Sequence, residues 1–259
     1  MPRLSIVTTS WDDGDPFDMK VAELLQARAL PGTFYFPFIG HRGRLTLDAA
    51  GLRSLRAAGF EIGAHSLSHP TLPKLGHEEI SREVRTCKRL LEDILGNEIR
   101  MFCYPKGKYS ATVIKYLKEA GYEAARTTRM LSTGLNFAPF EMPTSLHAYP
   151  HTRAAYLRNI ARAHNLSRLY DYLTRLDRTA TWVDLGKALF DRVLEHGGVW
   201  HLYGHSWLIE ELGLWDELRQ MLDYVSNRDG VVYVPNCDVL NFLPVKSTSL
   251  PMKYLSFLK

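Results

Sequence analysis

The feature that most constrains the fold is a regular alternation of short apolar runs with amphipathic segments, joined by connections of a few residues. The apolar runs are rich in β-branched and aromatic residues and have the length of strands, whereas the segments between them repeat apolar residues at helical spacing. Strands that alternate with helices form parallel sheets, open or closed. The sequence therefore predicts an α/β fold.

The boundaries of these elements follow from turn and capping residues. The predicted strands cover 4–10, 33–39, 60–64, 101–104, 122–128, 199–205 and 230–235, with a less regular candidate at 142–148. The predicted helices start at Pro16 and cover 47–58, 78–95, 110–120, 181–196 and 209–225. We expect one domain over residues 1–259, with a partly helical insertion around 150–180 and a surface segment beyond Leu243.

Polar residues suited to catalysis stand at the ends of separate predicted strands. Asp12 and Asp13 follow the first strand, His65 the third, Lys106 the fourth, and His205 ends the strand at 199–205. In a barrel of parallel strands the carboxyl ends share one face, which is where such folds keep their active sites. The sequence therefore predicts one site built from these five residues.

Asp13, His65 and His69 are the predicted metal ligands. Imidazoles at i and i+4 come to one side if the chain turns helically after the first. Two neutral imidazoles and a carboxylate suit Zn²⁺, would accept Co²⁺, Ni²⁺ or Mn²⁺, and leave a coordination position open. The alternative is that His65 and His69 are capping or core histidines.

Asp12 is the predicted general base. Adjacent carboxylates on an extended chain point to opposite sides, so one of them binds the metal while the other faces the reacting water and takes its proton. The alternative is an N-capping aspartate, because Gly14-Asp15-Pro16 is typical of a turn.

Two motifs in this order carry a resemblance to a known family. Ser10-Trp11-Asp12-Asp13-Gly14 followed by His65-Ser66-Leu67-Ser68-His69 resembles the polysaccharide deacetylase family, also known as the NodB-homology or carbohydrate esterase family 4 type. The resemblance covers about residues 4–130 and the strand at 199–205. It implies a distorted (β/α) barrel of about seven parallel strands, removal of acyl groups from amino sugars, Asp12 as base, and Asp13, His65 and His69 on the metal.

Tyr104-Pro105-Lys106-Gly107 resembles the third motif of that family, in which a turn offers a backbone N–H to the oxyanion. Lys106 stands where the family has an aromatic residue, but any residue except proline supplies the N–H. Tyr104 and Pro105 are then expected to contact substrate. The alternative is an ordinary Pro-Gly turn.

The sequence departs from the family at two positions that act together. Cys103 stands where the family often has an arginine that steadies the base, and Arg126-Thr127-Thr128-Arg129 stands where a partner acidic residue is usual. Our hypothesis is that Arg126 reaches Asp12 from its own strand and takes over this role. The alternative is a surface or substrate-binding arginine.

The strand at 199–205 supplies the predicted general acid. His201, Tyr203 and His205 share one face by the period of two, and Tyr203-Gly204-His205 resembles the family's Leu-x-His motif. His205 is expected to protonate the leaving nitrogen, with Tyr203 at the substrate, whereas His201 lies deeper. Gly204-His205-Ser206-Trp207 lacks the second glycine of a hydrolase elbow. His147, His151 and the tyrosines near them either line a sugar pocket or lie at the surface, and the sequence does not decide between these two alternatives.

Composition excludes other classes of function. With 32 basic and 28 acidic residues the net charge is +4, too small to indicate nucleic-acid binding or a membrane face. Cys87, Cys103 and Cys237 form no paired pattern, which favours reduced thiols and a cytoplasmic location. No stretch has the length of a transmembrane segment or signal peptide. The sequence leaves the oligomeric state open.

The predicted activity is metal-dependent hydrolysis of an N-acetyl or other acyl group on an amino sugar, a nucleotide-sugar or a glycan precursor. One alternative is a C–N hydrolase or deformylase that acts on a non-sugar amide. Another is a non-catalytic carbohydrate-binding relic, which would be expected to have lost part of the set formed by Asp12, Asp13, His65, His69 and His205.

Overall fold

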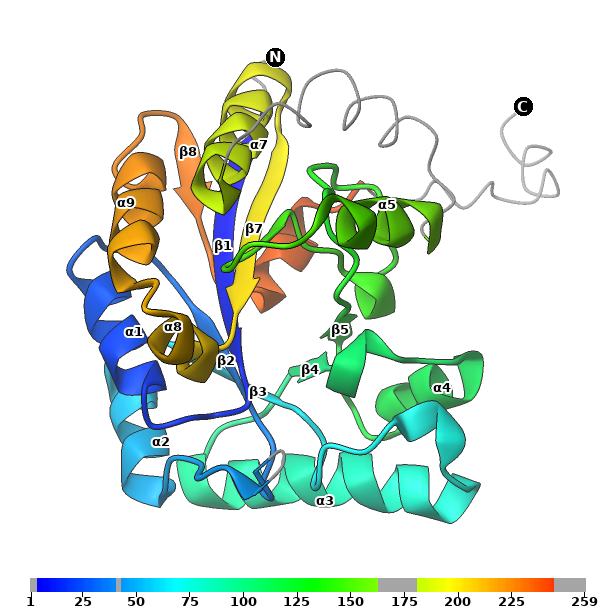
Figure 1. The fold of residues 1–259 in the computed structure, drawn as a ribbon. Coiled ribbons are helices and arrows are strands. Elements are labelled where there is room, and N and C mark those ends of the chain that lie inside the picture. Colours follow the sequence, from blue (N-terminus) through cyan, green and yellow to red (C-terminus); the bar gives the residue numbers. More distant parts are fainter. Residues whose placement is uncertain (1–3, 41–42, 163–180, 245–259) are drawn as a thin grey trace, which may run out of the picture.

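The computed structural model describes residues 4–40, 43–162 and 181–244, and its centre is one all-parallel sheet covered by helices (Figure 1). The strands are β1 (Ser5–Asp12), β2 (Thr33–Phe36), β3 (Glu61–Ala64), β4 (Met101–Cys103), β5 (Ala124–Arg126), β6 (Leu146–His147), β7 (Gly198–Gly204) and β8 (Val231–Tyr233). The helices are α1 (Asp18–Gln26), α2 (Ala49–Ala57), α3 (His77–Leu95), α4 (Ala111–Glu119), α5 (Arg153–Arg162), α7 (Trp182–His196), α8 (Ser206–Leu212) and α9 (Trp215–Val225).

Seven strands follow one another in the order β5-β4-β3-β2-β1-β7-β6, and the sheet curls into a half-barrel. β8 also pairs with β1, at its amino-terminal half, while β2 pairs with the carboxyl-terminal half. Residues 142–148 bridge the two ends of this order: the Met142 N–H donates to the Ala125 carbonyl, and the Ala148 N–H donates to the Tyr203 carbonyl. The predicted α/β fold with about seven parallel strands is confirmed.

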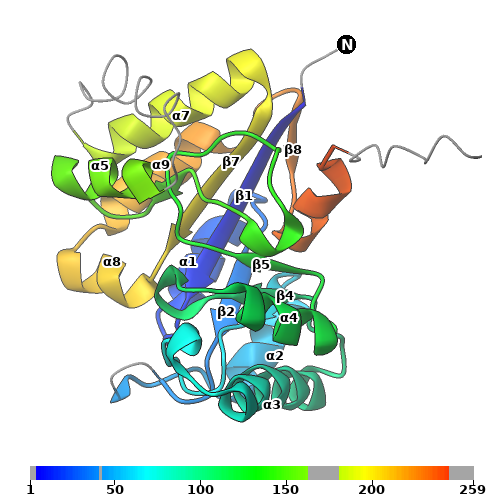
Figure 2. The ribbon, with the colours of Figure 1, turned by 90° about the vertical axis from the view of Figure 1, so that its right-hand side faces the viewer.

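The sheet is buried on both faces, which explains why its strands read as continuous apolar runs. Every residue of β1 is buried. The described helices pack on one face, with α7 and α9 beside β1 and β7 and with α2, α3 and α4 farther along the sheet (Figure 2). On the other face, residues such as Ile6, Tyr35 and Met101 form a second apolar cluster. Ile80, Val84, Cys87 and Leu91 form the buried face of α3.

Two predictions about the elements need correction or limitation. The helix predicted over 209–225 is two helices, α8 and α9, because Gly213 adopts a left-handed conformation (φ 67°) that ends α8. The candidate strand at 142–148 is reduced to the two residues of β6. In the predicted insertion, α5 is helical, while 163–180 and the surface segment from 245 onward lie outside the described residues.

None of the described helices combines the length and apolar character that spanning a bilayer requires.

Candidate active site

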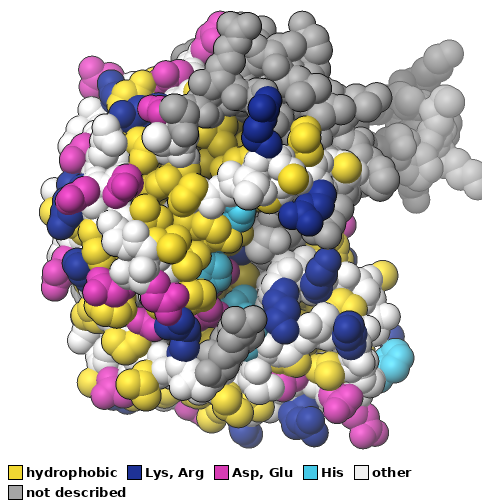
Figure 3. All heavy atoms as spheres, viewed as in Figure 1, with side chains coloured by type: hydrophobic (Ala, Val, Ile, Leu, Met, Phe, Trp, Pro, Cys, Tyr) yellow, Lys and Arg dark blue, Asp and Glu magenta, His cyan; other side chains and the backbone are white. Residues whose placement is uncertain are grey.

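A pocket of about 440 Å³ opens at the carboxyl ends of the strands, as the strand-end argument predicts. Histidine side chains are visible in the hollow in the middle of this face (Figure 3). The pocket is lined by eight predicted site residues: Asp12, Asp13, His65, His69, Tyr104, Lys106, Tyr203 and His205. Two further residues predicted to contact substrate, Pro105 and Arg126, are not among its lining residues; Arg126 lies behind Asp12 instead.

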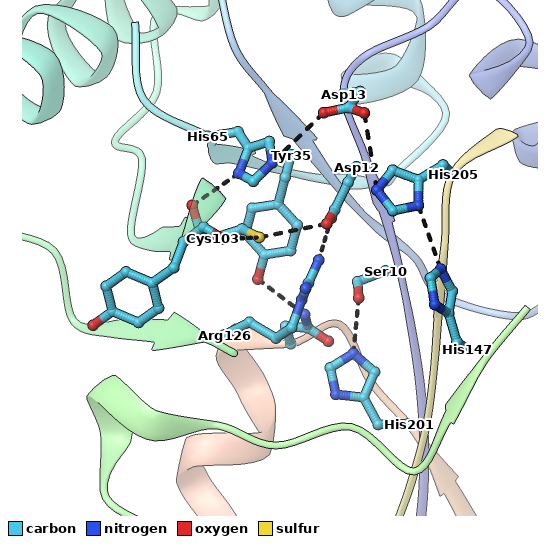
Figure 4. Close-up of polar contacts among 12 residues, drawn as sticks. Ser10, Asp12, Asp13, Tyr35, His65, Cys103, Arg126, His147, His201 and His205 are labelled. Atoms are coloured by element: carbon cyan, nitrogen blue, oxygen red, sulfur yellow. Dashed lines mark hydrogen bonds and ion pairs between the residues drawn. The ribbon is translucent and has the colours of Figure 1, made fainter. Parts of the chain in front are cut away.

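The turn after β1 separates the two aspartates. Asp12 is the last residue of the strand, whereas Asp13 (φ 78°) and Gly14 (φ 62°) are left-handed. A side chain at Gly14 would meet the Phe36 ring at 2.3 Å, so this position requires glycine. Asp13 consequently faces the histidines, while Asp12 faces β4 and β5 (Figure 4).

Asp13, His65 and His69 converge on a small volume. Asp13 Oδ1 lies 3.7 Å from His65 Nε2 and 3.5 Å from His69 Nε2, and the three ligand atoms lie within 4.8 Å of one another. Ligands bound at about 2.1 Å to one tetrahedral ion are roughly 3.4 Å apart. Asp13 Oδ1 is buried and has no hydrogen-bond partner among the described residues. These residues fit a divalent metal.

The two histidines meet by a route that differs from the prediction. Residues 65–69 are not helical; Ser66 (φ 66°) and His69 (φ 56°) are left-handed, and the two rings pack edge to face at 4.8 Å. The Glu83 carboxylate holds this loop by accepting hydrogen bonds from the Ser68 N–H (2.9 Å) and hydroxyl (2.7 Å). The two histidines at i and i+4 are therefore brought together by a turn that Glu83 of α3 stabilises, and not by a helix.

Hydrogen bonds behind the ligands orient them. His65 Nδ1 lies 2.8 Å from the Cys103 carbonyl oxygen, which can only accept, so Nδ1 carries the proton and the lone pair of Nε2 faces Asp13. On the other side of Asp13, the Trp207 indole N–H donates to Oδ2 at 3.1 Å. Both contacts are of the kind that fixes the geometry of metal ligands.

A second group of three ligand atoms, from Asp12, His65 and Cys103, lies nearby. It is less suited to a cation for two reasons. Burial raises the pKa of the Cys103 thiol well above its ordinary value, so the thiol stays protonated. The Arg126 guanidinium also occupies Asp12. The chemistry of the donors therefore favours Asp13, His65 and His69.

Arg126 forms an ion pair with Asp12 from the end of β5 (Figure 4). The arginine is fully buried and lies between the rings of Tyr35 and Tyr203, with its guanidinium carbon 5.3 Å and 4.7 Å from their centroids. Burial alone would raise the pKa of Asp12, but Arg126, followed by His65 and His205, lowers it to about 2. The hypothesis that Arg126 reaches Asp12 is confirmed, and a surface position is wrong.

Lys106 lies in the short turn Pro105–Gly107, with left-handed φ and ψ angles of 57° and 16°. This turn is closed by the Gly107 N–H, which donates to the Tyr104 carbonyl at 2.8 Å. A non-glycine residue in this conformation costs about 1 kcal/mol or more and is frequent at functional sites. The turn brings Lys106 to the pocket beside Thr128.

His205 follows β7 and faces Asp13, with its Nε2 3.8 Å from Asp13 Oδ2. Burial lowers its pKa, and Asp12 and Asp13 oppose that shift. His201 lies deeper, as expected: it is buried, and its nitrogens contact the Ser10 hydroxyl (2.9 Å) and the Pro143 carbonyl oxygen (3.1 Å).

Six pocket residues were given no definite role by the sequence interpretation: Arg44, Thr128, His147, Tyr149, Trp207 and Glu211. The Arg44 guanidinium stacks on the Trp207 ring at 4.0 Å and pairs with Glu211 across the pocket rim. The only signal for Trp207 was its place two residues after His205. Arg44 and His147 lie in stretches without a motif, so their approach depends on the fold.

Comparison with known proteins agrees with this geometry. Residues 3–125 match the family model described as polysaccharide deacetylase. YxkH of Bacillus subtilis, assigned to the polysaccharide deacetylases, is 24% identical over 130 residues, which are 49% of this chain and 46% of that protein. Chitin deacetylase 1 of Cryptococcus neoformans is 30% identical over 107 residues, 41% of this chain and 22% of the fungal protein. The chain therefore spans less than half the length of these relatives.

Solved structures share the fold. A Mycobacterium smegmatis protein assigned to the polysaccharide deacetylases superposes with a TM-score of 0.68 at 18% identity, over 94% of this chain and 91% of the other. BA3943 of Bacillus anthracis, a pseudoenzyme of carbohydrate esterase family 4, superposes with a TM-score of 0.55 at 15% identity, over 93% and 66%. Since a pseudoenzyme has this fold, activity has to be argued from the site.

Proposed function

We propose that the chain is a metal-dependent hydrolase that removes an N-acetyl or other acyl group from an amino sugar or glycan precursor, and the match of residues 3–125 to the polysaccharide deacetylase family model supports this proposal. The observation that carries the proposal is that His65 and His69 converge on the carboxylate of Asp13. The Asp13 Oδ1 atom is buried and has no hydrogen-bond partner in the described part of the chain. We propose Zn²⁺ as the ion, with Co²⁺, Ni²⁺ or Mn²⁺ as substitutes. When bound, such an ion supplies Lewis acidity and acidifies water.

Asp12 is proposed to take a proton from the attacking water. The lowered pKa, a result of Arg126, keeps the Asp12 carboxylate ionised at neutral pH. Because one oxygen, Oδ1, is engaged by Arg126, the ion pair also fixes the direction of the carboxylate. A general base held in this way contributes about 10²–10⁴-fold to a rate.

The remaining steps fall to the backbone N–H of Lys106 and to the His205 ring. The Lys106 N–H is proposed to donate a hydrogen bond to the carbonyl oxygen as negative charge develops on it. The bond from carbonyl carbon to nitrogen then breaks, and His205 gives a proton to the leaving nitrogen. The products are a carboxylic acid and an amine. The water proton is then on Asp12 and His205 has lost its proton, so transfer of a proton from Asp12 to His205 through solvent restores both groups.

The pocket walls suit a sugar substrate. Tyr104 and Tyr203 form part of the wall, and the half-buried Tyr149 and Trp207 present aromatic faces nearer the opening. We propose a sugar, nucleotide-sugar or lipid-linked glycan as substrate. A cytoplasmic location and a single domain over residues 1–259 remain predictions; the three cysteines are unpaired, which agrees with the first.

The test is acyl release from a panel of N-acetylated sugars, nucleotide-sugars and oligosaccharides, with Zn²⁺ or Co²⁺ and again after chelation. We expect acetate release that chelation abolishes and metal restores, and loss of about 10²-fold or more in Asp12→Asn. Undiminished release in the presence of a chelator would contradict metal dependence.

The same assay separates the alternatives. A deformylase would release formate, and a C–N hydrolase on another amide would release ammonia or a different acid. A carbohydrate-binding relic would bind sugars without turnover, and the family contains a pseudoenzyme of the same fold. Against the relic, Asp12, Asp13, His65, His69 and His205 are all retained and line one pocket. An Asp12→Asn variant as active as the parent would instead favour it.

A further inference from the structure

The rear nitrogen of His205 has an imidazole as its partner. His147 Nε2 lies 3.4 Å from His205 Nδ1 (Figure 4). His147 is the last residue of β6 and is aligned in register with Tyr203 of β7, two residues before His205. The His147 ring stacks on the Tyr203 ring, with centroids 4.0 Å apart and planes 21° apart. The neighbouring strand therefore holds His147 in place.

The other nitrogens of these two rings are also engaged. His147 Nδ1 lies 3.0 Å from His151 Nε2, which makes a row of three imidazoles that ends at His205. At the front of His205, Nε2 faces Asp13 and the pocket. The contact with His147 thus fixes which nitrogen of His205 is at the rear and which is available to a substrate.

We infer that His147 is a positioning residue for His205: it holds the rear nitrogen through a neutral imidazole and aims Nε2 at the leaving group. The inference rests on the proposed function, in which His205 is the proton donor. A carboxylate at this place could only accept a hydrogen bond, whereas a neutral imidazole has one donor and one acceptor nitrogen. His147 can therefore bond to Nδ1 both when it carries a proton and when it does not.

The surroundings keep His147 neutral. Burial, followed by the neighbouring His205 and His151, lowers the pKa of His147 well below its ordinary value, and burial lowers that of His151 to about 4. At neutral pH His147 has one N–H, which goes either to His205 or to His151.

The experiment compares the Zn²⁺-loaded parent with His147→Ala, His147→Gln and a matched control, His201→Gln. His201 is also a buried imidazole facing the barrel, but its nitrogens contact Ser10 and Pro143 rather than His205. We expect His147→Ala to lower kcat by about 10–100-fold with KM within about 3-fold, the size found when partners behind an active group are removed. The amide of His147→Gln can donate or accept and should recover most of kcat, and added imidazole should raise kcat of His147→Ala only.

Three outcomes would overturn the inference: unchanged kcat in His147→Ala, equal loss in His201→Gln at matched thermal stability, or equal loss in His147→Gln and His147→Ala. If His147→Ala does not fold, the Gln variant and the spectroscopic measurement below decide.

A second measurement does not depend on turnover. Long-range ¹⁵N–¹H correlation spectra report the tautomer of each histidine. We expect the His205 nitrogen shifts of His147→Ala to differ from those of the parent, and those of His147→Gln to lie closer to the parent. Identical His205 shifts in the parent and in every folded His147 variant would exclude a contact that matters. If the parent releases no acyl group from any substrate, the proposed function fails while this measurement still tests the pair.

Discussion

Replacing Arg126 by methionine should destabilise the protein strongly at neutral pH. The substitution removes the guanidinium that pairs with the buried Asp12 and leaves its carboxylate charge without a partner. Breaking a buried ion pair on one side costs about 3–5 kcal/mol, because the remaining charge has lost its water as well as its partner. For a chain of this size each kcal/mol lowers Tm by about 2–4 °C, so we expect a fall of roughly 6–20 °C.

The pH dependence gives this prediction a sign. In the parent, the pKa of Asp12 is lowered from 3.8 to about 2. Since one pKa unit is worth about 1.4 kcal/mol, this group contributes about 2 kcal/mol of stability, which is present above pH 3.8 and lost as the pH falls toward 2. Without Arg126 the effect of burial dominates and the pKa rises above 3.8. The deficit of Arg126→Met should then be largest near pH 7 and shrink as the pH falls toward 4.

The measurement is chemical denaturation from pH 4 to pH 8 for the parent, Arg126→Met, Asp12→Asn and the double variant, all with chelator so that metal binding does not contribute. Asp12→Asn removes the charge that the methionine variant leaves uncompensated, so Arg126→Met should cost at least 2 kcal/mol less in the Asn background. Equal costs in both backgrounds, or a deficit that does not change with pH, would refute the reasoning that Arg126 is retained to compensate Asp12.

Three further predictions follow from the contacts around the pocket. Asp13→Asn should weaken Zn²⁺ binding by at least about 10-fold in calorimetric titration, and affinity equal to the parent would remove Asp13 from the ligand set. Trp207→Phe keeps an aromatic ring but loses the N–H that donates to Asp13, so Zn²⁺ affinity should fall by about 10–100-fold, with Tyr149→Phe as a control that should keep parental affinity. Lys106→Gly keeps the backbone N–H and suits the left-handed conformation, so kcat should stay within about 3-fold; a large loss would transfer the role to the lysine side chain.

The predictable part of the site is the part that local sequence encodes. Asp13 and His65 were found because they stand at strand ends, and a parallel sheet brings its strand ends to one face. The pairing of Arg126 with Asp12 was anticipated from two departures that occur together, the cysteine at 103 and the arginine after the next strand. The first inference needed only the positions of the strand ends, whereas the second also needed the pattern of the family that the sequence resembles.

The missed residues depend on geometry at a finer scale. His147 lies opposite Tyr203 only because residues 142–148 cross from β5 to β7, and the weak strand pattern there did not predict that crossing. The loop at 65–69 was expected to be helical, but Glu83 on α3 holds it in left-handed conformations. Backbone preferences alone did not favour this outcome, since the stabilising partner lies on another element.

The sequence by itself determined the α/β class, the face on which the site lies and the residue types that meet there. The spacing of apolar residues and the polar residues that follow each strand can both be read from short stretches of sequence. Only the tertiary structure decided which nitrogen of each histidine faces the pocket, that Arg126 lies behind Asp12 rather than at the surface, and that an imidazole from β6 contacts His205. These depend on distances of a few ångströms between side chains far apart in the chain, and such distances are set by packing of the whole barrel.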